Sequence, residues 1–197
     1  MEHIIKNFEQ LAASALRKQA LSIAEAGLEA INTVQAFRKG FVYDNKKDQL
    51  VILGKKYNLS KSRNVYCIAF GKAAFLGISS VARILGQRLA SGFAIDVEAK
   101  DSPFAKGESF ANITFRTGTH PHPSSDNVKA AKELVEFIST AKENDLVLCL
   151  VSGGGSALLS HPHTLDVASQ ALILKELMNS GADIFEMNAV RKHLSAV

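Results

Sequence analysis

The residues best suited to chemistry form a loop of small side chains that directly follows an apolar run. The run is Leu146–Val151, and the loop consists of Ser152, Gly153, Gly154, Gly155 and Ser156. A short uninterrupted apolar run is typical of a strand buried in the middle of a parallel sheet. Glycines lack a Cβ, so they let the backbone turn sharply and approach another group closely. A helix that starts at Ser156 would direct its free N–H groups at the loop, so the pattern predicts a binding site for a phosphate or a carboxylate.

The local pattern matches neither of two well-known phosphate-binding loops. A P-loop requires a lysine directly after its last glycine, and the next lysine here is Lys175. A dinucleotide-binding loop requires glycine or alanine where Leu158 stands. A tight strand-to-helix turn that binds no ligand therefore remains the alternative interpretation of the loop alone.

Lys72 and Arg191 are the two cations that we interpret as catalytic. Lys72 follows Gly71 and the apolar run Val65–Phe70, which places it at the carboxyl end of a predicted strand. A positive charge at a helix start opposes the helix dipole unless an anion compensates, so a functional lysine is favoured over a solvated one. Arg191 shares a predicted helical face with Asn188, three residues earlier. The alternative for Arg191 is purely structural, because basic residues are favourable near any helix C-terminus.

Two His-Pro-His segments hold His120, His122, His161 and His163. Four histidines can make a zinc site, but rigid proline turns explain both segments, so we predict no metal ligands. His120 lies beside Gly118 after a predicted strand and is a candidate for substrate binding. Asp183 and Glu186 are candidates for a general base, although capping of the helix that follows them is the favoured interpretation.

These residues need a scaffold that brings the ends of separate strands together. Predicted strands alternate with predicted helices, which indicates an α/β fold with three α/β/α layers and a mostly parallel, Rossmann-like sheet. The carboxyl ends of parallel strands share one edge of a sheet, so we expect Gly71, Lys72, His120 and the glycine loop to cluster there. The predicted strands are 65–70, 92–97, 113–116 and 146–151; the predicted helices are 72–89, 125–142, 165–178 and 184–194; and 101–109 is a predicted loop.

The first 60 residues have a different pattern. Ile4, Phe8, Leu11 and Ala15 follow helical spacing within an Ala/Leu/Glu-rich stretch, 2–37, which predicts one long helix or two. Apolar runs at 41–43 and 50–53 flank a polar turn and predict a β-hairpin. We therefore expect a peripheral helix and hairpin lobe over 1–60 and the α/β core over 61–197.

Composition narrows the class of protein. Hydrophobic residues make up 47% of the 197 residues and charged residues 21%, which is typical of a globular chain. The net charge of +4 comes from scattered basic residues, so no nucleic-acid partner is indicated, while anionic substrates remain compatible. No apolar run approaches the ~18 residues of a membrane span, and no secretory signal is apparent, so we predict no membrane partner.

The cysteines and the last predicted helix carry two further expectations. Cys67 and Cys149 each lie within an apolar run, so both are predicted to be buried core residues. Two cysteines cannot form a disulfide framework, which favours a reducing, cytoplasmic location. The helix predicted near the end of the chain reaches within two residues of Val197 with no glycine or proline to stop it, so we expect the chain to be cut from a larger protein.

Four segments together resemble the N-terminal domain of the glycerate 2-kinase family, some members of which carry the older label hydroxypyruvate reductase. The segments are Gly71–Ala74, Gly118–Pro123, Ser152–Leu158 and Ser180–Ser195. They occur in the family's order, and the resemblance covers essentially the whole chain. The family's second domain, named MOFRL, has no counterpart within 1–197, so we expect this chain alone to be nearly inactive.

The resemblance implies ATP-dependent phosphorylation of D-glycerate at its 2-hydroxyl group, with Mg²⁺, in a cleft between two domains. It implies that Lys72 is catalytic and that the glycine loop and the helix carrying Arg191 line the same cleft. Two alternatives remain. One is an NAD-linked hydroxypyruvate reductase, although the glycine pattern fails the dinucleotide test. The other is a non-catalytic anion-binding fragment. The oligomeric state, a homo-oligomer included, is left open.

Overall fold

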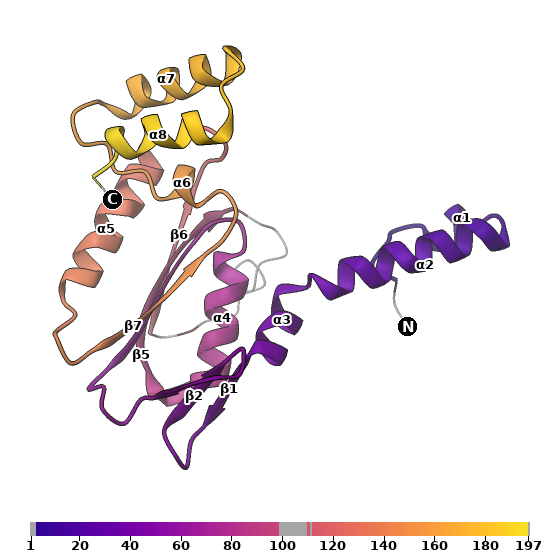
Figure 1. The fold of residues 1–197 in the computed structure, drawn as a ribbon, viewed down its shortest axis with the longest axis horizontal. Coiled ribbons are helices and arrows are strands. Elements are labelled where there is room, and N and C mark those ends of the chain that lie inside the picture. The colour runs from indigo at the N-terminus through magenta and orange to yellow at the C-terminus, as the bar shows by residue number, and fades with distance from the viewer. Residues whose placement is uncertain (1–2, 99–109, 111, 197) are drawn as a thin grey trace.

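A computed structural model describes residues 3–98, 110 and 112–196 of the chain. At its centre lies a four-stranded parallel sheet with the strand order β6-β5-β4-β7 (Figure 1). The strands are β4 (Val65–Phe70), β5 (Leu89–Val97), β6 (Ile113–Gly118) and β7 (Leu146–Val151). The predicted α/β class with a parallel sheet is confirmed. The loop predicted at 101–109 lies outside the described residues.

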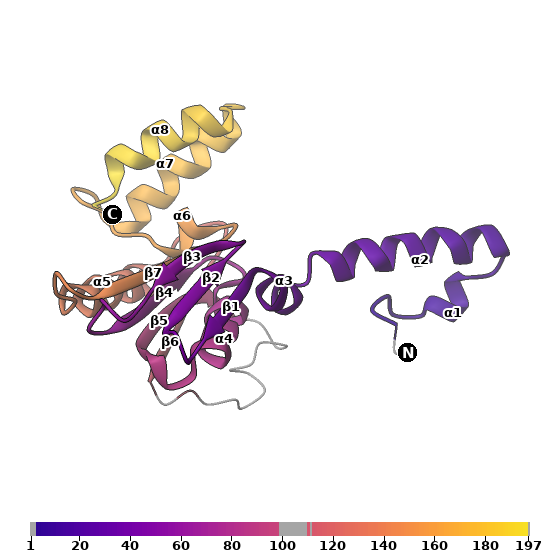
Figure 2. The ribbon, with the colours of Figure 1, turned by 60° about the horizontal axis from the view of Figure 1, so that its bottom comes forward.

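Helices cover both faces of this sheet and create three layers (Figure 2). The covering helices are α4 (Ala74–Leu85) on one face, and α5 (Ser125–Ser139) and α6 (Gly155–Leu158) on the other. Side chains alternate between the two faces of a strand, and β4 shows why both faces need cover. Its residues Val65, Cys67 and Ala69 are buried in the α4 layer, whereas Ile68 and Phe70 pack against the α5 and α6 layer.

A second sheet, antiparallel and three-stranded, packs beside α4. It consists of β1 (Phe41–Asp44), β2 (Gln49–Ile52) and β3 (Lys55–Asn58). The first two strands form the predicted hairpin; β3 was not predicted because its residues are polar and exposed. Leu50 and Leu59 are fully buried in the same apolar cluster as Val65, so the hairpin contributes to the main core. The division of the chain at residue 60 stays a prediction.

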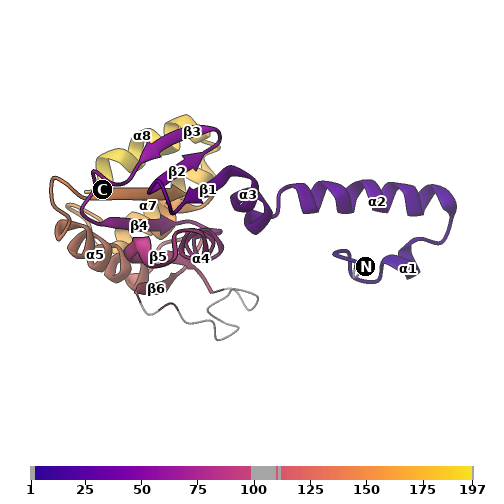
Figure 3. The same cartoon turned by 90° about the horizontal axis from the view of Figure 1, so that it is seen from below.

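The N-terminal stretch forms three helices where one or two were predicted. They are α1 (Phe8–Leu11), α2 (Ala15–Ala30) and α3 (Thr33–Gly40). Ser14 and Asn32 interrupt the helical run, because their side-chain oxygens accept hydrogen bonds from the first turns of α2 and α3. α2 extends away from the body of the molecule, and none of its residues is buried (Figure 3). None of the helices that the structure describes is long and apolar enough to cross a membrane.

The strand Leu146–Val151 is at the edge of the sheet, so the prediction of a central strand is wrong. β7 pairs with β4 on one side and has no partner strand on its other side among the described residues. Cys149 is exposed and Val151 is 68% exposed, so Cys149 is not the core residue that we predicted, whereas Cys67 is. An apolar run indicates a strand but does not reveal how many neighbours that strand has.

Helix boundaries differ from the predictions where glycine or polar residues end a helix early. The helix predicted over 72–89 is α4, which ends at Leu85 because Gly86 takes φ +54°, and Leu89 already begins β5. The helix expected from Ser156 is α6, a single turn of four residues. The last two helices are α7 (Val167–Asn179) and α8 (Ile184–Leu194), the second with the predicted bounds. They form a hairpin above the carboxyl edge of the sheet (Figures 1 and 2).

Leu50→Ala should lower the free energy of unfolding by about 2–5 kcal/mol, because it opens a cavity in the shared core. The matched control is Leu16→Ala on α2, where leucine is 77% exposed. That variant should change stability by no more than about 0.5 kcal/mol. Urea unfolding followed by circular dichroism measures both. A Leu50→Ala protein as stable as the Leu16→Ala protein would show that the hairpin lies outside the main core.

Candidate active site

Two turns that follow adjacent strands are bonded to each other at the carboxyl edge of the sheet. The backbone N–H of Lys72, just after β4, donates to the carbonyl oxygen of Gly153, just after β7, at 2.9 Å. The N–H of Ser152 donates to the carbonyl of Phe70 at 3.0 Å. These bonds place Lys72 directly beside the glycine loop, as the parallel-sheet argument predicted.

Glycine is required where the two turns touch. Gly71 has φ +117°, and a Cβ at this position would overlap the Oγ and carbonyl group of Ser152. The Ser152 hydroxyl accepts a hydrogen bond from the N–H of Ala73 at 3.1 Å. Gly71 and Ser152 therefore hold the two turns together. Their roles in substrate binding stay predictions.

Gly154 lies between Lys72 and His120. It has φ +87°, and a Cβ there would lie 2.8 Å from Cδ2 of His120 and 3.3 Å from Cγ of Lys72. The loop thus allows three strand ends to meet, with an imidazole on one side and an ammonium-bearing side chain on the other. The N–H of Gly155 is used within the loop, because it donates to the carbonyl of Ser152 at 3.2 Å. The role of Gly155 in anion binding stays a prediction.

Asn127 fixes the loop that carries His120, and the sequence analysis did not identify it. Its side chain is fully buried. Its Oδ1 accepts hydrogen bonds from the N–H groups of Thr119 and Ser124, and its Nδ2 donates to the carbonyls of Thr119 and Ala157. These four bonds tie the His120 loop to α6. The signal in the sequence was the capping-box spacing of Ser124 and Asn127.

Asp96 holds the other side of the Lys72 turn and was also missed. This carboxylate at the end of β5 is 3% exposed. It accepts hydrogen bonds from the N–H of Phe75 at 3.0 Å and of Val97 at 2.7 Å. Burial raises the pKa of Asp96, while these N–H groups oppose that shift. Asp96 therefore fastens the start of α4, just after Lys72, to β5.

The hairpin of α7 and α8 supplies the third side of the site. Asn188 and Arg191 of α8 line a pocket of about 260 Å³ together with His120, Gly154 and Ser156. Nε of Arg191 is buried and has no hydrogen-bond partner in the described part of the chain. A buried, unpaired guanidinium nitrogen favours an anionic ligand, because such a donor is costly to leave unsatisfied.

Burial and nearby positive charge both disfavour the protonated form of the His120 imidazole. Burial lowers the pKa of His120, and Lys72, Arg191 and His122 lower it further. The single turn α6 has only a small dipole. The side chains of Lys72 and Arg191 bring two full positive charges to this site.

Other candidates from the sequence have structural roles. The Asp183 carboxylate accepts hydrogen bonds from the N–H groups of Phe185 and Glu186, and Glu186 accepts one from the N–H of Asp183. This capping box engages both carboxylates that were considered as a general base. Across the described residues, no group of three or more His, Cys, Asp or Glu side chains is placed to hold a metal ion.

Comparison with known proteins identifies the family. The model for the domain of unknown function DUF4147 matches residues 19–197. The chain belongs to this family. A glycerate 2-kinase of Pyrococcus horikoshii is 33% identical over 184 residues, which cover 90% of this chain and 40% of that relative. A glycerate 2-kinase of Picrophilus torridus is 29% identical, covering 98% of this chain and 43% of the relative.

Solved structures agree with the sequence relatives. A crystal structure of a Pyrococcus horikoshii protein superposes with a TM-score of 0.71 at 30% identity, covering 94% of this chain and 40% of that one. The crystal structure of a Thermotoga maritima glycerate kinase superposes with a TM-score of 0.72 at 27% identity, covering 93% of this chain and 39% of that one. The resemblance to the glycerate 2-kinases is therefore confirmed, and the chain spans about two fifths of the length of these relatives.

Gly154→Ala should weaken anion binding at the site, because its methyl group would meet the imidazole of His120. Gly181→Ala is a matched control, since Gly181 also has positive φ, +78°, but has open space around it. Both variants should lose about 1–2 kcal/mol of stability from the left-handed conformation. Only Gly154→Ala should weaken binding of inorganic phosphate, by about tenfold or more. Chemical-shift titration measures binding, and equal phosphate affinity of the two variants would place the anion elsewhere.

Lys72→Met should raise the pKa of His120 toward its ordinary value, because the substitution removes a neighbouring positive charge that lowers it. Inorganic phosphate bound beside His120 should raise the same pKa, because an anion favours the imidazolium. Proton NMR titration of the imidazole resonances reports both effects. Lys132→Met on the exposed side of α5 is the control and should leave the His120 titration unchanged. A His120 pKa insensitive to Lys72 would contradict their juxtaposition.

Proposed function

We propose that this chain carries part of the active site of an ATP-dependent D-glycerate 2-kinase. The observation that supports this most directly is the convergence of Lys72, His120 and Arg191 around Gly154, beside an anion-sized pocket. The relatives that share the fold over this region are glycerate kinases. Phosphoryl transfer depends on positioning and on positive charge around the transferring group, and this site offers both.

In the proposed reaction, the 2-hydroxyl oxygen of glycerate attacks the γ-phosphorus of ATP. The bond from that phosphorus to the bridging oxygen of the β-phosphate breaks, and ADP leaves with the electron pair. The hydroxyl proton passes to a base, and the candidate for this base is the imidazole of His120, which lines the pocket beside Gly154. Lys72 neutralises the charge that develops on the phosphoryl oxygens. Arg191 and Asn188 hold an anionic group across the cleft from Ser156, while the backbone of Gly153 and Gly154 lets the substrates approach closely.

The described residues of the cleft do not form a magnesium site of their own. Mg²⁺ prefers carboxylate, water and phosphate oxygens, whereas the side chains that gather around Gly154 are cationic or neutral. The nearby carboxylates of Asp183 and Glu186 are engaged in capping α8. Mg²⁺ would bind chiefly through the phosphate oxygens of ATP, and the roles proposed for Lys72, His120 and Arg191 are those of the side chains themselves.

The remaining proposals concern the cellular setting and the alternative activities. Cys67 and Cys149 are both free thiols, which supports a reducing compartment such as the cytoplasm.

An NAD-linked hydroxypyruvate reductase would oxidise NADH with hydroxypyruvate and form no 2-phosphoglycerate. A non-catalytic anion-binding module would bind phosphate and form neither product. Product analysis with ATP and D-glycerate, and in parallel with NADH and hydroxypyruvate, separates the three.

In the complete gene product, Lys72→Ala should lower kcat by about 10²-fold or more, or ~3 kcal/mol, because a cation at the transferring group is lost. Lys72→Arg should not restore the rate, because a forked guanidinium places its charge differently from a compact ammonium. The assay is ATP- and glycerate-dependent formation of 2-phosphoglycerate, with circular dichroism as the folding control and Lys132→Ala as the matched variant. A Lys72→Ala enzyme that keeps more than about a third of the original kcat would show that Lys72 is a solvated lysine with no role in catalysis.

Residues 1–197 expressed alone should fold and show almost no turnover in the same assay.

A further inference from the structure

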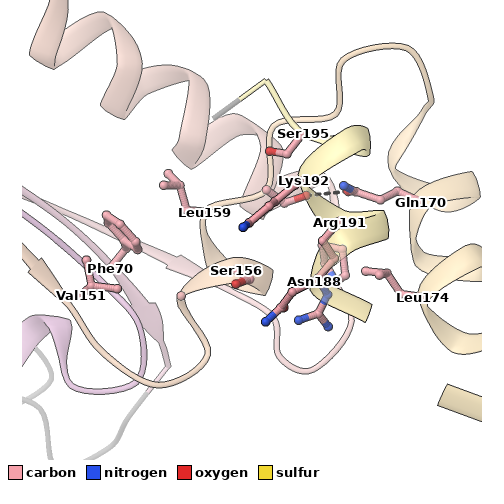
Figure 4. Close-up of a pocket in the computed structure, with 13 residues that line it drawn as sticks. Phe70, Val151, Ser156, Leu159, Gln170, Leu174, Asn188, Arg191, Lys192 and Ser195 are labelled. Atoms are coloured by element: carbon pink, nitrogen blue, oxygen red, sulfur yellow. Dashed lines mark hydrogen bonds between the residues drawn. The ribbon is translucent and has the colours of Figure 1, made fainter. Parts of the chain in front are cut away.

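Two pockets at the candidate site share a single wall. The first, described above, has a volume of about 260 Å³. The second has a volume of about 360 Å³ and lies between the sheet edge and the α7–α8 hairpin. Ser156, Asn188 and Arg191 line both pockets. Figure 4 shows Asn188 and Arg191 projecting from α8 opposite Ser156. Compounds bound in the two pockets would therefore meet at this wall.

The larger pocket has apolar sides on both of its flanks. Phe70 and Val151 come from the ends of β4 and β7, Leu159 follows α6, and Leu174 of α7 lies at the opposite end of the pocket, beyond Arg191 and Asn188 (Figure 4). Val151 is 68% exposed, so the floor of this pocket is an apolar surface open to an occupant. Such a surface suits a planar heteroaromatic ring, and it suits a three-carbon hydroxy acid poorly because every carbon of that acid carries oxygen.

Polar groups in the larger pocket suit both the base and the phosphates of a nucleotide. Gln170 is 5% exposed, and its Oε1 accepts a hydrogen bond from the Ser160 hydroxyl at 2.7 Å. This bond fixes the amide plane, whose NH₂ group can donate to a ring nitrogen. Lys192 extends from α8 toward Ser156 and Leu159 at the mouth of the pocket (Figure 4). Its ammonium group can pair with a phosphate there.

The smaller pocket has the opposite character. His120, Asn188 and Arg191 supply hydrogen-bond donors and charge, and Gly154 leaves room beside them. Its volume of about 260 Å³ is below the range of roughly 300–1,000 Å³ that is usual for drug-sized ligands. A small carboxylate fits these properties, because a guanidinium can bind it with two parallel hydrogen bonds.

We propose that the larger pocket binds the base-bearing part of an adenine nucleotide and the smaller pocket binds the carboxylate of the 2-hydroxy acid. The transferred phosphoryl group then lies at the shared wall, between Ser156 and Arg191. This assignment rests on the proposed kinase function and adds to it the place of each substrate.

Three exposed apolar residues provide a matched set of substitutions. Val151, which is 68% exposed, lines only the larger of the two pockets; Ile184, which is 56% exposed, lines only the smaller; and Leu172, which is 58% exposed, lines neither. Each is replaced by Asp in the complete gene product, so that each variant gains the same negative charge at a surface position. Lys192→Met tests the larger pocket a second time without adding a carboxylate. Urea unfolding shows whether each variant is folded.

Calorimetric titration with ADP and, separately, with D-glycerate measures the outcome, together with the KM values for ATP and glycerate. Val151→Asp should weaken ADP binding about tenfold or more and change glycerate binding by less than about twofold. Ile184→Asp should do the reverse, Leu172→Asp should change neither ligand, and Lys192→Met should weaken ADP alone.

Three results would overturn the assignment: the opposite pairing of variants and ligands, equal weakening of both ligands by either variant, or unchanged binding of both ligands by all variants. If the unsubstituted protein forms 2-phosphoglycerate while any of these is observed, the pocket assignment fails and the kinase function stands. If the unsubstituted protein forms no 2-phosphoglycerate, the kinase function fails and the assignment fails with it.

Discussion

The candidate site depends on the close contact between two backbone turns at the edge of the sheet. The turn after β4 and the turn after β7 are bonded through Lys72 N–H and Gly153 carbonyl, and they touch where Gly71 meets Ser152. Only a residue without a Cβ fits at Gly71, because its φ is positive and its Cβ direction is filled by Ser152. If these turns separated, Lys72 would move away from His120, and the positive potential between them would weaken. The chemistry proposed for the cleft is therefore a consequence of backbone packing.

The α7–α8 hairpin is closed at its base by backbone hydrogen bonds between the segment that enters it and the segment that leaves it. His163 N–H donates to the carbonyl of Leu194, and Ala196 N–H donates to the carbonyl of His161. Both bonds lie where the chain enters and leaves the hairpin. Arg191 and Asn188 reach the cleft from this hairpin, whereas Lys72 and the glycine loop belong to the edge of the sheet. The site thus combines residues placed by parallel strands with residues placed by a helical hairpin whose two ends are bonded to each other.

Local sequence patterns predicted which segments of the core form strands and helices. They did not predict which segments lie next to each other in the fold. The runs at Val65 and Leu146 gave strands with the predicted bounds, because apolar continuity bounded by glycine is a local signal. The place of β7 at the edge was not predictable from its residues, since strand order is set by contacts between segments that are distant along the chain. The same limit explains why Asp96 and Asn127 were missed. The roles of Asp96 and Asn127 come from hydrogen bonds to other loops, which the local sequence does not show. Lys72 and Arg191 were identified because each is a positive charge at a predicted end of an element, Lys72 after a strand and Arg191 near the end of a helix.

The projecting α2 helix has a consequence for how the molecule melts. Most helices in globular proteins owe their stability to packing, and isolated helices shorter than ~12–15 residues are marginal in water, so a helix only slightly longer gains little stability from its length. α2 has 16 residues, none of them buried, and it is braced mainly by the short segment before it, where Glu25 accepts a hydrogen bond from the N–H of Ile5. Its amide hydrogens should therefore exchange with solvent through local fraying, well before those of β4 and α4. On heating, helical ellipticity should begin to decline gradually below the cooperative transition of the sheet, so that a single two-state curve would describe the α/β body but not the whole chain.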